Sequence, residues 1–464
     1  MTVRWFLVFF FLIGGIRAEK PNVLFIAVDD LRPEILKFGA EYSVTPYIDR
    51  LCEQGVRFER AYCMVPTCGA SRASLMTSVR PTRDRFKSFN SYASKDAPSA
   101  KPIHTHFKEQ GYYTVSLGKV FHGKGDHEDG WSEKPWRSDV KAYVTKEAIE
   151  QLEKDAKGRM RGPATESANV EDVVYRDGQI AKRAVEQMEK LAKRNQPFFL
   201  AVGFTKPHLP FNAPTRYWEL YDKKTVKMPD NFYIPKGAPS ISIHASGELR
   251  NYSDIPKKGP ISEETALNLI HGYHACVSYV DVLIGQVLDQ LDALRLKDNT
   301  VVVLWGDHGW NLGEHTLWCK HSCYETSLHA PLIISVPGMK EIKKGRAARQ
   351  LTEFIDIYPT LCELAGVRIP DHVEGKSLLP VLLNPEAVHK PFAISRFGEG
   401  DTIRTHRYRY SLYRDRNGKV IGRMLYDHKV DPAENKNIAV NPEHALLVKR
   451  LETQLLANMG KIEN

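Results

Sequence analysis

Hydrophobic residues form short, nearly uninterrupted runs at residues 21–28, 112–117, 197–204 and 300–305. Such runs are typical of strands buried on both faces, as in a parallel sheet. Helices are predicted between and after these runs, at 45–55, 103–110, 172–193, 263–294 and 354–365. The alternation of strand and helix predicts an α/β fold, in which a mostly parallel sheet is flanked by helices.

Other segments have weaker patterns. Residues 56–62 alternate between apolar and polar, which predicts one short strand, and another strand is predicted at 331–336. Residues 125–165 lack clear periodicity, so we expect a long functional loop with one helix near 145–157. Residues 221–262 are irregular and basic.

The composition changes near Pro391. Beyond it, residues 393–397, 402–412 and 424–427 alternate like antiparallel strands, and residues 443–459 form an amphipathic helix. This pattern predicts a small α+β subdomain with an antiparallel sheet. We therefore expect a large domain at 19–385 and a C-terminal subdomain at 386–464.

Residues 1–18 have the features of a secretion signal peptide. Arg4 supplies positive charge, residues 5–13 form an apolar core, and the segment ends in the small residue Ala18. The apolar run is too short to span a bilayer, and no second run approaches that length. We expect a secreted or periplasmic chain after signal removal, without stable membrane insertion.

The composition is that of an ordinary globular chain, with 42% hydrophobic and 26% charged residues among 464. The formal net charge of +9 fits an anionic partner, although a solvated basic face gives the same balance. We expect no nucleic-acid partner. The seven cysteines are an odd number, so at least one is unpaired, and the sequence leaves any pairing open.

Polar residues follow the predicted strands at their carboxyl ends, where open α/β sheets bind ligands. Asp29 and Asp30 follow the first strand, and adjacent carboxylates repel unless a cation lies between them, although a surface turn or helix cap would also explain the pair. The others are Lys119, His122, His208, Asp307, His308 and Lys320. Any one of these residues could instead be an exposed lysine or a histidine packed in the core. Because so many of them lie at or just after strand ends, together they indicate one shared site.

Residues 65–75 carry Cys68 and Arg72 among small residues, which predicts a turn entering a helix. Cys68 would lie at the helix N-terminus, where backbone N–H groups attract an anion. Arg72, one turn later, lies on the same face. A buried cysteine at a helix start is the alternative to a nucleophile beside an anion site.

Cys68-x-Ala70-x-Arg72 resembles the modification signature of the type I sulfatases, in which the cysteine is oxidised to formylglycine and its hydrate is the nucleophile. The resemblance is strongest to the iduronate-2-sulfatase-like branch and implies the alkaline-phosphatase-like fold, with a catalytic sulfatase domain at 19–385. It rests also on residues 22–30, Gly118 to His122, Lys206-Pro207-His208, Gly306-Asp307-His308-Gly309, Asp356-x-x-Pro359-Thr360, Leu425-Tyr426-Asp427 and Asp431-Pro432.

The resemblance implies a divalent cation that binds a sulfate oxygen, with Ca²⁺ ahead of Mg²⁺. Its ligands would be Asp29, Asp30, Asp307, His308 and the modified Cys68. His308 stands where most of the family has Asn or Gln, and imidazole suits a hard cation poorly, so His308 either binds the metal or contacts the sulfate.

The resemblance also implies the roles of the remaining residues. Lys119 and Lys320 would hold sulfate oxygens, and Arg72 would steady the hydrate. His208, with Lys320, would protonate the leaving sugar oxygen. His122 would deprotonate the second hydroxyl of the hydrate and so expel the sulfate, a step that a plain Ser or Cys cannot take.

A formylglycine-generating maturation enzyme is the implied partner, and conversion of Cys68 leaves six cysteines. Gly69 and Ala70 replace the more usual Ser/Thr and Pro, which leaves the acceptance of Cys-Gly-Ala-Ser-Arg by that enzyme open.

The sequence thus predicts a secreted, Ca²⁺-dependent sulfatase that acts on an anionic sulfated oligosaccharide. The branch resemblance favours a sulfated uronic acid, as in glycosaminoglycans or algal polysaccharides. One alternative is a phosphomonoester or phosphonate ester hydrolase of the same fold. Another is a protein that binds sulfated glycans without catalysis, if Cys68 is unmodified.

Overall fold

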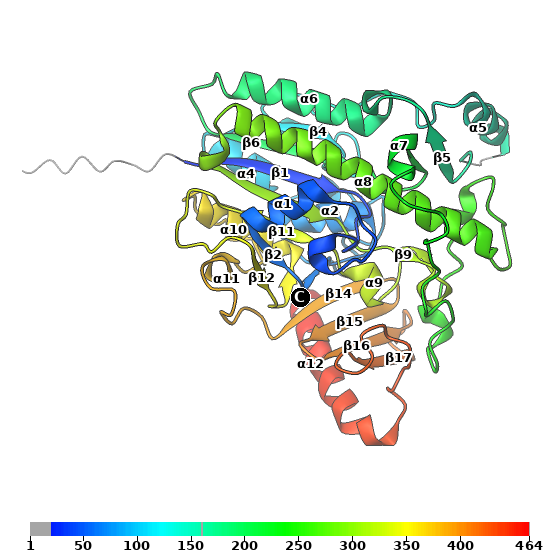
Figure 1. The fold of residues 1–464 in the computed structure, drawn as a ribbon. Helices are drawn as coiled ribbons and strands as arrows, with labels where there is room; N and C mark the ends of the chain where they lie inside the picture. The colour runs from blue at the N-terminus through cyan, green and yellow to red at the C-terminus, as the bar shows by residue number, and fades with distance from the viewer. Residues whose placement is uncertain (1–19, 159–160, 464) are drawn as a thin grey trace, which may run out of the picture.

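The computed structural model describes residues 20–158 and 161–463. Its centre is a seven-stranded sheet in the order β12-β2-β11-β8-β1-β6-β4 (Figure 1). The strands are β1 (Asn22–Val28), β2 (Val56–Phe58), β4 (Tyr113–Gly118), β6 (Phe198–Phe204), β8 (Thr300–Gly306), β11 (Leu332–Ser335) and β12 (Arg346–Ala348). The four hydrophobic runs of the sequence form the neighbouring strands β8, β1, β6 and β4, all parallel.

The predicted α/β fold with a mostly parallel sheet is confirmed, and β11 is the exception because it pairs antiparallel with both β8 and β2. The prediction of one strand over residues 56–62 is wrong. The chain turns after β2, and β3 (Ala61–Tyr62) pairs instead with β13 (Thr352–Glu353) in a separate sheet. The turn contains the charged pair Glu59 and Arg60, which alternation of apolar and polar residues does not distinguish from a strand.

Helices cover both faces of the central sheet, because alternate side chains of its strands point in opposite directions. Leu24, Ile26 and Val28 of β1 pack with α1 (Pro46–Gln54), α6 (Arg176–Leu191) and α8 (Glu263–Ala293). Val23, Phe25 and Ala27 pack with α2 (Cys68–Thr77), α4 (Ile103–Glu109) and α10 (Ile357–Leu364). The two layers enclose separate apolar cores, so the sheet is buried on both sides.

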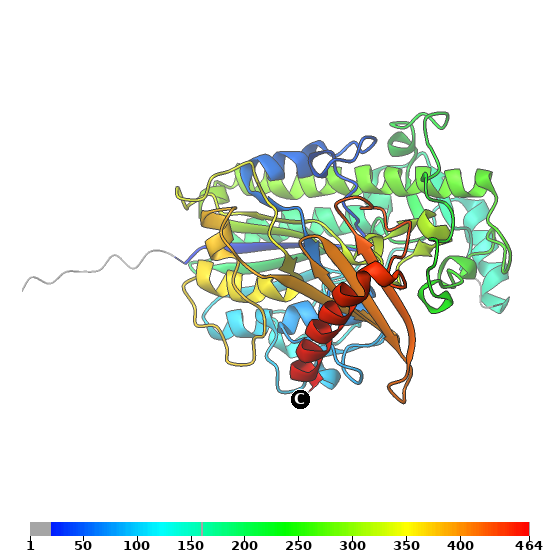
Figure 2. The ribbon, with the colours of Figure 1, turned by 90° about the horizontal axis from the view of Figure 1, so that it is seen from below.

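The C-terminal part forms an antiparallel sheet of β14 (Phe392–Phe397), β15 (Gly400–Thr405), β16 (Tyr408–Arg414) and β17 (Val420–Asp427). Helix α12 (Ala445–Glu463) crosses one face of this sheet, as Figure 2 shows. Tyr413, Met424 and Tyr426 pack from the sheet against Leu317 and Tyr324. The prediction of a single strand over 402–412 is wrong, because the chain reverses at residues 406–407 between β15 and β16.

Short elements occupy the connecting segments. They are α3 (Ala93–Asp96), α5 (Lys146–Gly158), α7 (Thr215–Trp218), α9 (Glu325–Leu328), α11 (Leu379–Leu383), β5 (Thr165–Ala168), β7 (Phe211–Pro214), β9 (Asn311–Leu312) and β10 (Trp318–Cys319). Helix α5 lies where the sequence predicts one within the long loop. No helix in the described ranges is long and apolar enough to cross a membrane. The predicted signal peptide, 1–18, lies outside the described residues.

All seven cysteines lie within the described ranges, and each is a buried, free thiol. The packing therefore holds these residues without a covalent link in this structure.

Glu353, at the end of β13, links Arg80, which follows α2, to the start of the C-terminal sheet. Its carboxylate accepts hydrogen bonds from Arg80 Nη1 at 2.7 Å and Arg80 Nη2 at 2.5 Å, and from Lys390 Nζ at 2.5 Å. It also accepts the backbone N–H of Ile394, in β14, at 2.9 Å. Burial opposes its ionisation, but Arg80 and Lys390 hold the pKa of Glu353 well below its ordinary value.

We predict that Glu353→Gln lowers the free energy of unfolding by about 3 kcal/mol at pH 7, because it leaves the positive charge of Arg80 uncompensated. The folded-state pKa is lowered, so the carboxylate stabilises the fold above its ordinary pKa of 4.5, and this contribution is lost as the pH falls below that value. The difference between wild type and variant should therefore shrink in acid. Urea unfolding at several pH values measures it.

The matched control is Glu399→Gln, an exposed position in the turn between β14 and β15. It should change stability by less than about 0.5 kcal/mol. Equal stability of Glu353→Gln and wild type at pH 7 would contradict the assignment.

Candidate active site

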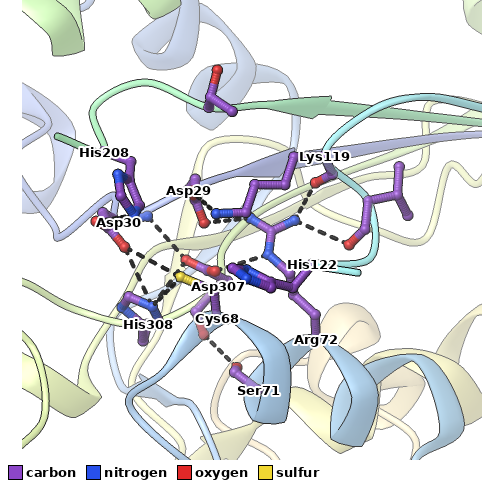
Figure 3. Close-up of polar contacts among 12 residues, drawn as sticks. Asp29, Asp30, Cys68, Ser71, Arg72, Lys119, His122, His208, Asp307 and His308 are labelled. Atoms are coloured by element: carbon purple, nitrogen blue, oxygen red, sulfur yellow. Dashed lines mark hydrogen bonds and ion pairs between the residues drawn. The ribbon is translucent and has the colours of Figure 1, made fainter. Parts of the chain in front are cut away.

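Four neighbouring strands of the central sheet end at one edge and bring the predicted residues together. Asp29 and Asp30 directly follow β1, and Asp307 and His308 directly follow β8. In register, Val28 of β1 lies beside Gly306 of β8, so the acidic residues after these strands meet (Figure 3). Further predicted residues come from other segments: Lys119 follows β4, His208 follows β6, Lys320 follows β10, and Cys68 begins α2.

A cavity of about 670 Å³ opens at this edge. The predicted residues that line it are Asp29, Cys68, Lys119, His122, His208 and Lys320. Asp30, Arg72, Asp307 and His308 are fully buried beneath them. The structure therefore brings all ten predicted site residues to one place.

Arg72 links the ends of three strands. Its Nη2 lies 2.9 Å from Asp29 Oδ1, and its Nε lies 2.8 Å from Asp307 Oδ2. It also donates to the carbonyl oxygens of Lys119 and Val120, the latter at 3.0 Å. A fully buried arginine requires such compensation, and here it fixes the first turn of α2 against β1, β4 and β8.

Cys68 is the first residue of α2, and its side chain faces the acidic residues. Its Sγ lies 3.3 Å from His308 Nε2 and 3.8 Å from Asp30 Oδ1. Burial, and next the negative charge of Asp29, raises the pKa of the Cys68 thiol well above its ordinary value. Reactive cysteines instead have a lowered pKa, so the unmodified thiol is a poor nucleophile in this position.

The two adjacent aspartates have different surroundings. Burial opposes the ionisation of Asp29, but Lys119 and Arg72 hold its pKa well below the ordinary value. Burial raises the pKa of Asp30, although His208 and Lys320 lie nearby. Asp30 has a left-handed backbone, with φ of 60°, and its N–H donates to Asp307 Oδ1 at 3.0 Å.

The donor atoms fit a bound divalent cation. His308 Nδ1 lies 2.9 Å from the carbonyl oxygen of Gly309, which can only accept, so Nδ1 carries a proton and Nε2 faces the acidic residues. That Nε2 lies 3.3 Å from Asp30 Oδ1 and 3.7 Å from Asp307 Oδ1. Carboxylate oxygens and an imidazole nitrogen this close together can serve as ligands of one divalent cation.

His208 and Lys320 form a pair on one side of the cavity. Lys320 Nζ lies 3.1 Å from both carboxylate oxygens of Asp30, and the ring of Trp310 lies 4.8 Å away. The loop that carries His208 is held by Lys206, whose buried Nζ donates to the carbonyl oxygens of His208 and Pro210.

Glu248 joins this pair, and sequence reasoning missed it. Its Oε1 lies 3.2 Å from His208 Nε2 and 3.1 Å from Lys320 Nζ. It belongs to the irregular segment 221–262, where no periodicity or motif marks a functional residue.

His122 and Arg137 lie on the other side of the cavity. Burial, together with the nearby Lys119, lowers the pKa of His122 to about 3, so the imidazole is neutral. Arg137 donates to the carbonyl oxygens of Phe121, at 2.5 Å, and His122, at 3.1 Å, and so holds this loop. Burial and the charge of Arg72 lower the pKa of Arg137 to about 10. Sequence reasoning missed Arg137 because it lies in the aperiodic segment 125–165.

Two solved structures share the overall fold. One, determined in complex with its substrate D-glucosamine-2-N,6-O-disulfate, has a TM-score of 0.76 and 22% identity, over 96% of this chain and 98% of that chain. The other, the phosphonate monoester hydrolase of Agrobacterium radiobacter, has a TM-score of 0.76 and 21% identity, over 96% of each chain. The predicted alkaline-phosphatase-like fold is thereby confirmed.

Sequence comparisons identify the family. The sulfatase family model matches residues 21–367, and the model for the C-terminal part of N-sulphoglucosamine sulphohydrolase matches residues 313–461. Iduronate 2-sulfatase of Homo sapiens is 32% identical over 403 residues, which cover 77% of this chain and 73% of that protein. Family members are sulfuric ester hydrolases and generally use formylglycine and a divalent metal. The chain therefore belongs to the type I sulfatase family, with its resemblance to the iduronate-2-sulfatase-like branch confirmed.

Proposed function

We propose that this chain hydrolyses sulfate esters of a sulfated carbohydrate, with a formylglycine formed from Cys68. The observation that carries the proposal is the convergence of buried carboxylates, the His308 imidazole and Cys68 at the bottom of a cavity lined by Lys119 and Lys320. Anionic groups there suit a cation, and the lysines suit the oxygens of a tetrahedral anion.

The metal would be held by Asp29, Asp30, Asp307, His308 and residue 68, with Ca²⁺ ahead of Mg²⁺ because most of these ligands are oxygens. A metal bound by these residues would supply Lewis-acid polarisation of the ester, and formylglycine at residue 68 would supply the attacking oxygen. Lys119 and Lys320 bind the sulfate oxygens and offset their charge.

The chain's own residues would move the protons. His208 and Lys320 lie together beside Asp30 and would donate a proton to the leaving sugar oxygen. His122, neutral and on the other side of the cavity, would accept a proton from residue 68 when sulfate leaves. Arg72 contacts Asp29 and Asp307 in this structure. Because Arg72 and residue 68 both belong to α2, Arg72 would position residue 68 through this helix.

A sulfated uronic acid, from a glycosaminoglycan or an algal polysaccharide, is the substrate that we favour. Beyond the sulfate-binding lysines, the cavity is lined by Lys124, Arg137, Arg161 and Arg176, which suit further anionic groups on an oligosaccharide. We also propose secretion or export to the periplasm through residues 1–18, maturation by a formylglycine-generating enzyme, and a division into a catalytic domain at 19–385 and a subdomain at 386–464.

Phosphomonoester or phosphonate ester hydrolysis is the second candidate, because a phosphonate monoester hydrolase shares the fold and phosphate needs a similar anion site. We predict that the purified protein hydrolyses 4-nitrophenyl sulfate with a kcat/KM at least about 10-fold above that for 4-nitrophenyl phosphate. A panel of defined sulfated oligosaccharides, analysed for released sulfate, then identifies the sugar. A strong preference for phosphate would contradict the sulfatase proposal.

We predict that mass spectrometry of the Cys68 peptide from native-source protein detects an aldehyde in place of the thiol. Cys68→Ala should lower kcat at least about 10³-fold, because it removes the nucleophile. An unconverted thiol, together with no ester hydrolysis and retained binding of sulfated glycans, would support the binding protein instead.

We predict that chelation abolishes turnover and that Ca²⁺ restores it and raises the thermal midpoint. His308→Ala should weaken the Ca²⁺ response at least about 10-fold, whereas His308→Asn should keep it, because an amide oxygen suits a hard cation. Titration of Ca²⁺ against the thermal midpoint measures both. An unchanged Ca²⁺ response in His308→Ala, with a raised KM, would instead place His308 on the sulfate.

A further inference from the structure

Glu248 places a carboxylate in a cavity whose charged side chains are mainly basic, with Asp29 and Asp177 as the other acidic lining residues. It lines the cavity, and its side chain is 14% exposed. A carboxylate in this cavity opposes the binding of an anionic ester through like-charge repulsion. Its presence therefore requires a compensating role, and its contacts indicate which one.

The contacts of Glu248 are confined to one functional group of the site. Glu248 Oε1 lies 3.2 Å from His208 Nε2, and Oε2 lies 3.0 Å from Lys320 Nζ. Lys320 and His208 hold the pKa of Glu248 well below its ordinary value although burial opposes ionisation, so it is a carboxylate. Among the described residues, no hydrogen bond or ion pair joins it to Lys119, Arg72 or His122, which serve the sulfate and the nucleophile.

These contacts fix the directions of both proton donors. The ring of His208 lies between two acceptors, the carbonyl oxygen of Leu209 at 2.6 Å from Nδ1 and Glu248 at Nε2, which together define its plane. Lys320 Nζ bridges Asp30 and Glu248, since it donates to both carboxylate oxygens of Asp30 and to Glu248 Oε1, each at 3.1 Å. Without Glu248, Asp30 alone would attract Lys320, and the ring of His208 could rotate about its side-chain bonds.

The segment that carries Glu248 is itself anchored beside Lys320. Ser246 Oγ accepts the backbone N–H of Trp318 at 3.1 Å, two residues before Lys320. The neighbouring Leu249 is buried in the core next to α8. Glu248 is therefore held in place from both sides of its position in the chain.

We propose that Glu248 is a positioning residue that aims His208 and Lys320 at the leaving-group oxygen, an inference that rests on the proposed sulfatase function. As the bond from sulfur to the sugar oxygen breaks, its electron pair goes to that oxygen, which takes a proton from His208 Nε2 or Lys320 Nζ. The new bond forms between sulfur and the oxygen nucleophile at residue 68. Alignment by Glu248 matters most when the leaving oxygen is too basic to depart without that proton.

The test compares two sulfate esters in one variant. Glu248→Gln keeps the shape of the side chain but removes its charge. We predict about a 100-fold lower kcat for a sulfated sugar, whose alkoxide leaves poorly, with no rise in KM, because the charge that repels the ester is removed. For 4-nitrophenyl sulfate, whose phenolate leaves without a proton, kcat should fall by less than about 3-fold. Glu248→Asp, which restores the carboxylate one methylene shorter, should recover part of the loss on the sugar ester.

Glu219→Gln is the matched control, since Glu219 is exposed and lies outside the cavity; it should match wild type on both esters. Equal losses of Glu248→Gln on both esters, including losses through misfolding, or no loss on the sugar ester, would overturn the inference. If wild type hydrolyses neither ester, the sulfatase proposal itself fails.

Discussion

Three buried carboxylates at one edge of the sheet repel one another, and the rest of the site compensates for their charge. Asp29 and Asp30 follow β1, Asp307 follows the adjacent parallel strand β8, and all three are fully buried. At low dielectric such a cluster is unfavourable unless cations lie against it. Arg72, Lys119 and Lys320 supply that charge, each from a different element.

The same charge compensation explains the spacing of the cysteine motif. Arg72 is anchored by Asp29 and Asp307, which fixes the rotation of α2 about its axis. Residue 68, one turn earlier on the same face, must then point at the carboxylates. The departure at Gly69 has a steric reason, because a Cβ there would lie 2.1 Å from the carbonyl oxygen of Phe89. The usual Ser or Thr would displace the segment that contains Phe89.

The elements that could be predicted from the sequence are those whose local hydrophobic pattern directly reflects how they are buried in the fold. The runs at β1, β4, β6 and β8 are hydrophobic on both faces because helices cover both faces, so their identity and the residues at their ends could be predicted. Strand pairing is a different matter. The antiparallel direction of β11 and the turn between β2 and β3 depend on contacts with distant segments, which local alternation does not contain.

The same distinction between local pattern and distant contacts applies to the residues of the site. Residues that follow buried strands were predicted, whereas Glu248 and Arg137 lie in long aperiodic segments and acquire their position only through tertiary contacts. Glu248 depends on Ser246 contacting the backbone of Trp318, and Arg137 on the carbonyl groups of residues 121–123. Trp318 is far from Glu248 in the sequence, so no local motif could reveal that Glu248 belongs to the site.

The backbone at Asp30 separates two halves of the site. Successive side chains of an extended strand already point in opposite directions, but both aspartates lie beyond the strand, and Asp30 takes a left-handed conformation that aspartate tolerates better than most residues. Asp29 thereby contacts Lys119 and Arg72, while Asp30 lies near His208 and His308 (Figure 3). Asp30 also contacts Lys320. One two-residue turn thus supports the half that holds the nucleophile's helix and the half that holds the proposed acids. Since the carboxylates diverge from a single point, a cation between them would touch both halves at once.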